Sequence, residues 1–231
     1  EHALALALKD SPSQPTVVAW PGSDGMADVA PKADVADAAD LVPFMKRAGV
    51  DLCVVGEESY LAAGLADQAR AAGILVWGPN QDAAQMEASK EFAKQFMFRH
   101  DIPTGASVTV NTPEALKAAV TSYPAVLKFD GLAAGKGVAV CLDEAAVDAY
   151  VQDVLVDRIF GEGEVLVEEF LDGKELSIIC SVCDDQYQAF VPARDYKRLA
   201  ENDDGPNTGG MGVVASLEII PGELLEAICR D

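Results

Sequence analysis

The sequence predicts an α/β region of parallel strands and covering helices, followed by an α+β region whose last strands are antiparallel. Up to about residue 80, short β-branched runs alternate with alanine-rich helical stretches, a rhythm typical of βαβ units. Further along, two strand-like runs are separated by Asp184 and Asp185, as in a hairpin. The 231 residues are sufficient for two domains, since domains commonly have about 100 to 200 residues.

In the first region, strands are expected at residues 16–20, 51–56 and 74–78, and helices at 39–49 and 60–73. Gly49 and Gly73 lie between helix and strand, where glycine commonly ends a helix. The opening EHALALAL is helix-like and no strand precedes it, whereas a Rossmann-like unit begins with a strand and a glycine turn. The first strand of the unit is therefore expected to be missing.

A longer helix is predicted over residues 82–100, with Pro103 at or after its end. The small α+β unit that follows has expected strands at 106–110, 124–129, 137–142 and 164–171, and helices at 113–120 and 144–155. Residues 174–182 and 187–193 suit antiparallel strands. Residues 199–212 are polar, rich in glycine and without periodicity, so they are predicted to form a mobile loop.

The composition excludes several classes of partner. With 38 acidic and 17 basic residues, the formal charge is −21, which repels nucleic acids and anionic membranes. No apolar run approaches the roughly 18 residues that cross a bilayer. Five cysteines form no disulfide framework, and His2 and His100 are too few for a zinc cluster. We expect a cytoplasmic protein without a metal site in these residues.

The stretch KFDGLAAGKGVAV, residues 128–140, has the composition of a phosphate-binding loop but is not a P-loop. Three residues, not four, separate Gly131 from Gly135, and Gly137 stands where a P-loop needs a hydroxyl after Lys136. Lys128 ends a predicted strand just before the glycines, so an ammonium and backbone N–H groups can meet one anion. On this stretch alone, a hairpin with Lys136 in solvent remains the simpler alternative.

A second stretch, VLVEEFLDGKELS, favours the anion-binding interpretation. Glu168 and Glu169 are neighbours on a strand and face opposite ways, so they do not form an acid/base pair. The segment that follows has free backbone groups that can bind an adenine edge, and a carboxylate a few residues further on can accept from ribose hydroxyls. The chain thus presents a lysine on a strand, then a glycine loop, then a segment with carboxylates. This order suits the binding of ATP.

These motifs together resemble the ATP-grasp superfamily and, within it, the phosphoribosylamine glycine ligase family. EHALA, PGSDGMA, GPNQDAAQMEASKEFAKQFM and DYKRLAENDDGPNTGGMG are similar to further segments of that family, in the same order. The resemblance implies a Rossmann-like domain at residues 1–88 and an ATP-grasp domain at 89–231. In the latter, residues 104–172 would be the lid subdomain and 173–231 part of a larger subdomain.

The resemblance also implies residue roles. Lys90 and Lys128 would bind the ATP phosphates, Glu168 the adenine amino group and Glu175 the ribose. The other implied nucleotide-binding residues are Gly131, Gly135, Lys136, Gly137, Glu169, Phe170 and Leu171. Catalytic contacts would come from Lys128, Asp195, Lys197, Arg198 and Asn207. Substrate-binding residues would be Glu1, His2, Gly22, Asp204, Pro206, Asn207, Thr208 and Gly209.

The implied reaction joins glycine to 5-phosphoribosylamine through a glycyl phosphate, using ATP and Mg²⁺ or Mn²⁺ whose ligands are expected beyond residue 231. A monomer is favoured, and this chain alone is expected to be inactive. Glu57, Ser23 and Asp24 depart from the family pattern, and an added carboxylate disfavours phosphate binding. The alternatives are another ATP-grasp ligase, which GPNTGGMG beside GLAAGKGV argues against, and a noncatalytic nucleotide-binding module.

Overall fold

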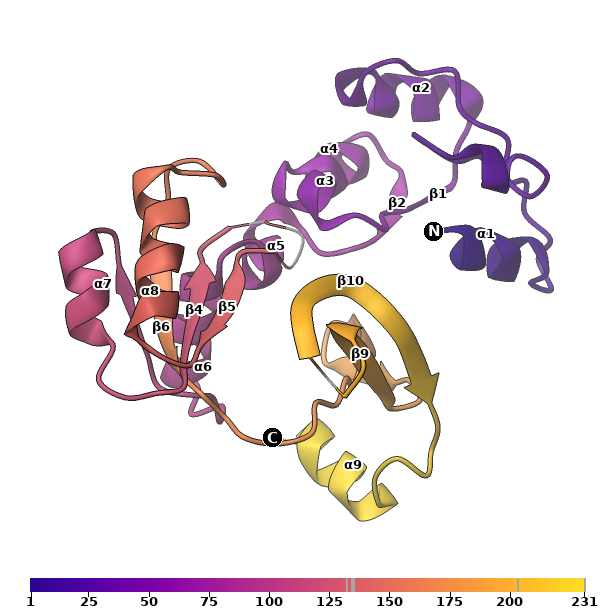
Figure 1. The fold of residues 1–231 in the computed structure, drawn as a ribbon. Coiled ribbons are helices and arrows are strands. Elements are labelled where there is room, and N and C mark those ends of the chain that lie inside the picture. Colours follow the sequence, from indigo (N-terminus) through magenta and orange to yellow (C-terminus); the bar gives the residue numbers. More distant parts are fainter. Residues whose placement is uncertain (132, 134–135, 203, 231) are drawn as a thin grey trace. The chain divides into compact units, whose positions relative to one another are not determined.

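The computed structural model describes residues 1–131, 133, 136–202 and 204–230. The chain divides into two compact units, Glu1–Ala88 and Ser89–Asp231. Figure 1 shows the elements of both units along the sequence. The predicted class, a parallel sheet followed by antiparallel sheets, is confirmed.

The first unit is built around a parallel strand pair. Its elements are α1 (His2–Lys9), the 3₁₀ turns η1 (Asp24–Met26) and η2 (Ala38–Asp40), α2 (Leu41–Ala48), β1 (Leu52–Val54), α3 (Glu58–Ala62), α4 (Leu65–Ala71), β2 (Leu75–Trp77) and α5 (Gln81–Ala88). β1 and β2 pair in parallel, with Leu52 opposite Leu75. Leu41 and Met45 of α2 pack with Ala69 of α4 beside them, forming a small core.

Two predictions for the first unit were wrong. Residues 16–20 form no strand, because only Ala19 makes a parallel bridge, to Lys32. The helix expected over 60–73 is two helices, α3 and α4, separated at Gly64, whose φ of 83° is outside the helical range. The predicted end of α2 is confirmed, since Gly49 adopts the left-handed conformation with φ of 67°.

The second unit begins where the predicted long helix breaks. Ser89 separates α5 from α6, and its hydroxyl accepts a hydrogen bond from the Phe92 backbone as the N-cap of α6. The further elements are α6 (Lys90–Arg99), β3 (Ser107–Val110), α7 (Pro113–Ala119), β4 (Ala125–Phe129), β5 (Val138–Cys141), α8 (Glu144–Val151), the π-helical turn η3 (Gln152–Val156), β6 (Val165–Glu169), β7 (Cys180–Cys183), β8 (Gln186–Ala189), β9 (Ala193–Ala200), β10 (Asp204–Ala215) and α9 (Gly222–Arg230).

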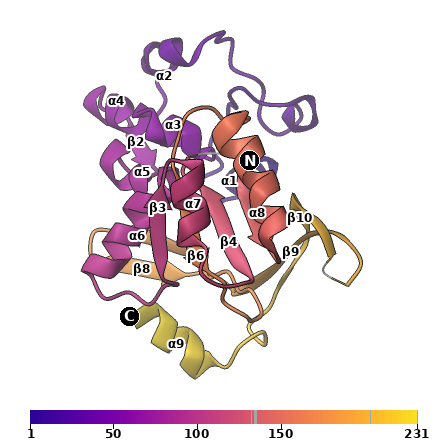
Figure 2. The ribbon, with the colours of Figure 1, turned by 60° about the vertical axis from the view of Figure 1, so that its left-hand side comes forward.

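Four of these strands form an antiparallel sheet in the order β3-β6-β4-β5, and α7 and α8 cover one of its faces (Figure 2). Successive strand residues point to opposite faces, so β4 contributes Leu127 and Phe129 to the covered side and Lys128 to the other. The buried core on the covered side consists of Leu116, Leu127, Phe129, Cys141, Val147, Tyr150, Val151, Val154, Val165 and Val167. This packing fixes the sheet that carries Lys128.

Truncation of Leu127 tests the importance of this core. Leu127 is fully buried, so Leu127→Ala is expected to lower the free energy of unfolding by about 3 kcal/mol, through lost burial and the cavity that remains. Urea unfolding followed by circular dichroism measures the change. Leu142→Ala is the control, because Leu142 is 70 % exposed and should change stability by less than about 0.5 kcal/mol. Equal effects of the two substitutions would contradict this assignment of the core.

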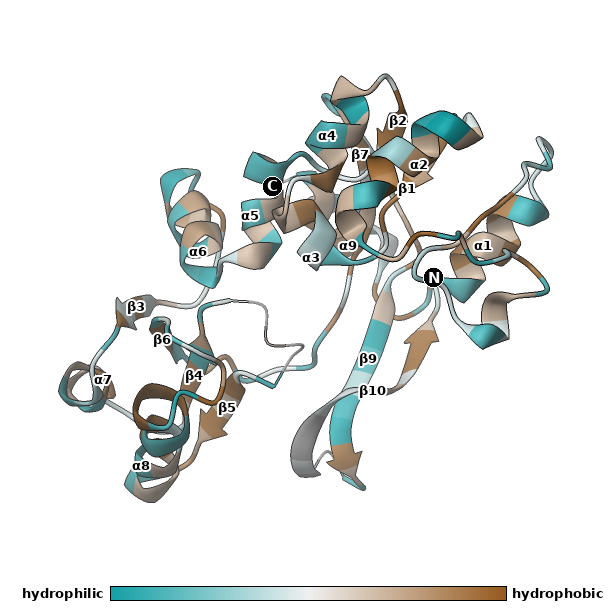
Figure 3. Cartoon of the chain, turned by 90° about the horizontal axis from the view of Figure 1, so that it is seen from above, coloured by the Kyte–Doolittle hydropathy of each residue, from teal (hydrophilic) through white to brown (hydrophobic). Residues whose placement is uncertain are grey.

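Two hairpins follow the sheet. β7 and β8 are antiparallel and join through Asp184 and Asp185, as predicted. The mobile loop predicted at 199–212 is wrong, because most of it belongs to strands β9 and β10, which pair antiparallel. β10 accommodates its glycines through two register shifts, one on either side of Asn207. Figure 3 shows how polar β9 is, which explains why no apolar alternation marked this hairpin in the sequence.

No helix in the described part of the chain has the length and apolar character needed to cross a membrane.

Candidate functional site

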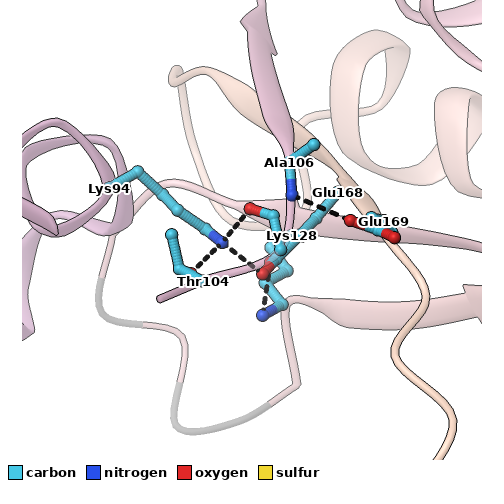
Figure 4. A network of polar contacts seen from close by, with 7 residues as sticks. Lys94, Thr104, Ala106, Lys128, Glu168 and Glu169 are labelled. Atoms are coloured by element: carbon cyan, nitrogen blue, oxygen red, sulfur yellow. Dashed lines mark hydrogen bonds and ion pairs between the residues drawn. The ribbon is translucent and has the colours of Figure 1, made fainter. Parts of the chain in front are cut away.

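Three charged side chains meet on the face of the sheet opposite α7 and α8 (Figure 4). Lys94 Nζ lies 2.5 Å from Glu168 Oε1, and Lys128 Nζ lies 2.5 Å from Glu168 Oε2. Lys94 also donates to Thr104 Oγ1 at 2.7 Å and to the Gly105 carbonyl at 2.8 Å. We call Lys94, Lys128 and Glu168 the charged cluster. It joins α6, β4 and β6.

Strand register brings the cluster together. In the antiparallel pair of β4 and β6, Lys128 lies opposite Leu166 and Val126 lies opposite Glu168. Residues two apart on a strand share a face, so Lys128 and Glu168 are diagonal neighbours on the same side of the sheet. Lys94 reaches them from α6. The prediction that Glu168 and Glu169 face opposite ways agrees with the burial of the Glu168 side chain and the exposure of Glu169.

The lysines determine the charge state of Glu168. Burial by itself raises the pKa of a carboxyl group, but the hydrogen bonds and charges of Lys128 and Lys94 outweigh this effect and hold the pKa of Glu168 below its ordinary value. Glu168 is therefore ionised at neutral pH. The cluster has two positive charges and one negative charge, which leaves one positive charge in a chain whose formal charge is −21.

A consequence is acid sensitivity. Because the pKa of Glu168 is lowered on folding, its contribution to stability is present above the unfolded value of about 4.3 and is lost as the pH falls through the folded pKa. The difference in unfolding free energy between the wild type and Glu168→Gln should therefore shrink as the pH is lowered below about 4.3. Urea unfolding from pH 7 to pH 3 measures it. A difference that stays constant over this range would contradict the lowered pKa.

The start of the glycine loop is tied to the N-terminus of α6. The Asp130 carboxylate accepts from Ser89 Oγ at 3.0 Å and from the Lys90 and Glu91 backbone N–H groups at 2.6 and 3.3 Å. Lys90 Nζ donates to the Gly131 carbonyl at 2.8 Å. A carboxylate at a helix N-terminus is favourable, since it pairs with backbone N–H groups that have no helical partner. Lys90 is thereby held beside the strand that carries Lys128.

The far end of the loop is also fixed. The Gly137 carbonyl accepts from the Tyr150 hydroxyl at 2.8 Å and from the Phe129 backbone N–H at 2.8 Å. A Cβ at Gly137 would lie 3.1 Å from Phe129 Cβ, so glycine permits this close approach. Lys136 is exposed, as expected for a residue near the loop tip. Gly135 lies outside the described residues.

The segment after β6 is open to solvent. The Glu169 carboxylate accepts a hydrogen bond from the Ala106 N–H at 3.1 Å, which links the end of β6 to the residue before β3. Phe170 and Leu171 are 38 % and 63 % exposed. These two residues have no regular secondary structure.

The remaining predicted residues of the second unit gather around β9 and β10. Lys197 Nζ lies 3.0 Å from Asp195 Oδ2 and 3.2 Å from Glu175 Oε2. The hydrogen bond with Asp195 raises the pKa of Lys197, and Glu175 adds to this, against the opposing effect of partial burial. Arg198 donates to the Gly205 carbonyl at 2.7 Å, and Thr208 donates to the Lys197 carbonyl at 2.8 Å.

The other residues predicted to bind substrate lie partly in the second unit and partly in the first. At Gly209, an added Cβ would meet no atom of the described residues within 4 Å. Asp204, Pro206 and Asn207 lie on β10, but their side chains are outside the described part. In the first unit, Glu1 is the N-cap of α1 and contacts Gly56, just after β1, while His2 is exposed at the start of the same helix. Gly22 forms a separate turn, with φ of 65°, against Ala19.

Sequence reasoning missed Lys94 and Asp130. One signal could have found Lys94, which follows Lys90 by four residues and thus shares its face of a helix. Asp130 had no such signal, since its partners lie about 40 residues earlier. Both residues act on predicted site residues, because Lys94 binds Glu168 and Asp130 binds the Lys90 backbone.

The arrangement suits recognition of an anion by fixed positive charge. Two lysines, Lys90 and Lys128, lie at the end of β4 where the glycine loop begins. The Ser89 hydroxyl there donates to the Asp130 carboxylate and caps α6, and no described His is hydrogen-bonded to a Ser or Cys side chain beside it. Among the residues that the structure describes, no group of three His, Cys, Asp or Glu side chains could hold a metal ion.

Comparison with known families agrees with this pattern. The family model "Phosphoribosylglycinamide synthetase, N domain" matches residues 1–87, and "Phosphoribosylglycinamide synthetase, ATP-grasp (A) domain" matches residues 88–231. Curated phosphoribosylamine–glycine ligases from Agrobacterium fabrum and Brucella melitensis are 43 % and 44 % identical over the whole chain. The chain spans 56 % and 55 % of their lengths.

A solved structure is also similar. The crystal structure of phosphoribosylamine–glycine ligase from Thermotoga maritima superposes with a TM-score of 0.81 at 29 % identity. The match covers 98 % of this chain and 56 % of that one.

Proposed function

Because the chain belongs to the phosphoribosylglycinamide synthetase family, we propose that it forms the nucleotide-binding part of an ATP-dependent ligase that makes glycinamide ribonucleotide from glycine and 5-phosphoribosylamine. ATP supplies the phosphoryl group that activates the glycine carboxylate, so that the amine of phosphoribosylamine can attack the acyl phosphate. ADP and phosphate are the other products. The pathway is de novo purine biosynthesis.

Two lysines beside the start of the glycine loop, Lys128 and Lys90, carry this proposal. Lys128 places a partly exposed ammonium at the end of β4, where the glycine loop starts, and Lys90 lies against the first glycine of that loop. Such groups neutralise the charge of transferring phosphoryl oxygens and hold the reacting groups in position. This chemistry needs no side-chain nucleophile, because catalysis of phosphoryl transfer comes almost entirely from positioning and electrostatic stabilisation.

In this proposal, β6 and the segment after it bind the nucleoside. Glu168 is ionised and can accept from the adenine amino group, while backbone near Phe170 and Leu171 holds the ring. Glu175, exposed beside Lys197, would accept from the ribose hydroxyls. We assign residues 104–172 to the lid subdomain and 173–231 to part of the larger one.

The hairpin of β9 and β10 is our candidate for the reaction-centre contacts. Lys197 is held by Asp195 and Glu175, and Arg198 by the Gly205 carbonyl, so both cations have defined positions. Mg²⁺ or Mn²⁺ would neutralise phosphate charge, but the described residues provide no ligand set for either ion. We assign no step to the metal.

A kinetic experiment on the protein that contains this chain tests the proposal. Coupled detection of ADP should show release that requires both glycine and phosphoribosylamine. Omission of either substrate is the control, and it should reduce ADP release to the background rate of ATP hydrolysis. ADP release that is independent of one of the two substrates would exclude this ligase activity.

A further inference from the structure

The lysine that sequence reasoning missed is held more firmly than any other group in the cluster. Lys94 is 5 % exposed, although lysine is seldom buried. An ammonium has three N–H donors, and Lys94 uses three acceptors, namely Thr104 Oγ1, the Gly105 carbonyl and Glu168 Oε1. Burial of the charge is costly, and these contacts offset that cost. Lys94 therefore has no spare donor for a ligand.

Lys128 is placed differently. Its side chain is 30 % exposed, and within the described residues its ammonium pairs with one atom, Glu168 Oε2. The buried Oε2 atom has no further hydrogen-bond partner in the described part, so its contact there is the ion pair with Lys128. A flexible ammonium with unused donors can turn toward a phosphate without breaking other bonds.

We propose that Lys94 is a positioning residue of the nucleotide site, which holds the Glu168 carboxylate in place while Lys128 exchanges Glu168 for the ATP phosphates. This inference rests on the proposed function. Lys94 retains Oε1 throughout, and the departure of Lys128 leaves Oε2 as an acceptor for the adenine amino group. One movement of Lys128 thus couples recognition of the base to recognition of the phosphates.

Among the described residues, two charged side chains form ion pairs with Glu168. Lys94 approaches from α6 and Lys128 from β4, while on the β3 side the nearest strand neighbour is the uncharged Ser107. Glu169, next in sequence, points away and binds the Ala106 backbone. Removal of Lys94 leaves Lys128 as the one counter-charge of Glu168 among the described residues.

The first test compares ATP and adenosine. Lys94→Met keeps the length of the side chain and removes its charge. The affinities for ATP and for adenosine, measured by isothermal titration calorimetry, should each fall about tenfold, because Lys94 no longer holds the Glu168 carboxylate in place. Thr104→Val removes one acceptor of Lys94 and should lower the affinity for both ligands about threefold. This variant replaces Lys94→Met in the test if Lys94→Met does not fold. Lys117→Met is the matched control, since Lys117 is half exposed on α7 and pairs with Asp148.

Two results of this test would overturn the proposal. If Lys94→Met binds both ligands as the Lys117→Met control does, Lys94 has no positioning role. If it loses affinity for ATP and not for adenosine, Lys94 serves the phosphates and not Glu168. Circular dichroism of each variant first establishes that it is folded.

A second measurement needs no nucleotide and separates this inference from the proposed function. In protein labelled with ¹³C-glutamate, the Glu168 carboxyl can be titrated by NMR. Lys94→Met should raise the pKa of Glu168, and Lys117→Met should not. If the wild type binds neither ATP nor adenosine, the proposed function fails, while this titration still decides whether Lys94 holds the carboxylate. An unchanged pKa in Lys94→Met would overturn the inference.

Discussion

Replacement of Lys128 by methionine is expected to weaken ATP binding on the order of 100-fold, because a hydrogen bond to a charged group contributes roughly 1.5–3 kcal/mol. Lys128 carries a partly exposed charge at the start of the glycine loop, while Lys94 is already saturated by its three acceptors. Isothermal titration calorimetry with ATP measures the loss. Adenosine should lose much less affinity, since it lacks the phosphates.

The control for this substitution is Lys117→Met, which removes an exposed lysine of the same unit and should leave ATP affinity unchanged. The fold of Lys128→Met should persist, because Glu168 keeps Lys94 as its partner. If Lys128→Met binds ATP within twofold of the wild type, Lys128 is not a phosphate ligand. An equal loss for ATP and adenosine would also contradict the assignment.

Glu168→Gln is expected to lower the free energy of unfolding by about 3–5 kcal/mol, the cost of leaving a buried charge without its partner. Lys94 would keep its two neutral acceptors but lose the only carboxylate that it contacts in the described part. Urea unfolding at pH 7 measures the change. Glu169→Gln is a matched control one residue away, where the carboxylate is exposed, and it should cost less than about 1 kcal/mol.

A double substitution separates charge from shape. If the unpaired Lys94 ammonium causes the instability of Glu168→Gln, adding Lys94→Met should recover part of the lost stability, since two neutral groups of similar size replace a broken ion pair. Additive losses in the double variant would show that the two residues are not coupled.

The sequence predicted those elements whose signals are local. Gly49 ends α2 because a glycine adopts a positive φ at low cost, and Asp184 and Asp185 turn the β7–β8 hairpin. Alternation along β4 and β6 placed Glu168 and Glu169 on opposite faces without reference to any other part of the chain. In each case the information lies within a few residues.

The wrong predictions depended on distant contacts. The 82–100 helix breaks at Ser89, where a capping hydroxyl and Asp130, far along the chain, bind the first N–H groups of α6. β10 is a strand because β9 supplies its partner, although its glycines favour a loop. Lys94 was not singled out from the sequence, because its burial depends on contacts with Thr104, Gly105 and Glu168, which lie 10 to 74 residues further along the chain.

The pairing of Lys128 with Glu168 gives the lysine a counterion that belongs to the protein. The contact is 2.5 Å, well inside the screening length of about 8 Å in physiological salt, so dissolved ions scarcely weaken it. Chloride or another small anion must compete with a carboxylate whose local concentration is fixed by the fold. Only a ligand that makes several contacts at once can displace it. The ion pair thus disfavours the binding of chloride and other simple anions to Lys128.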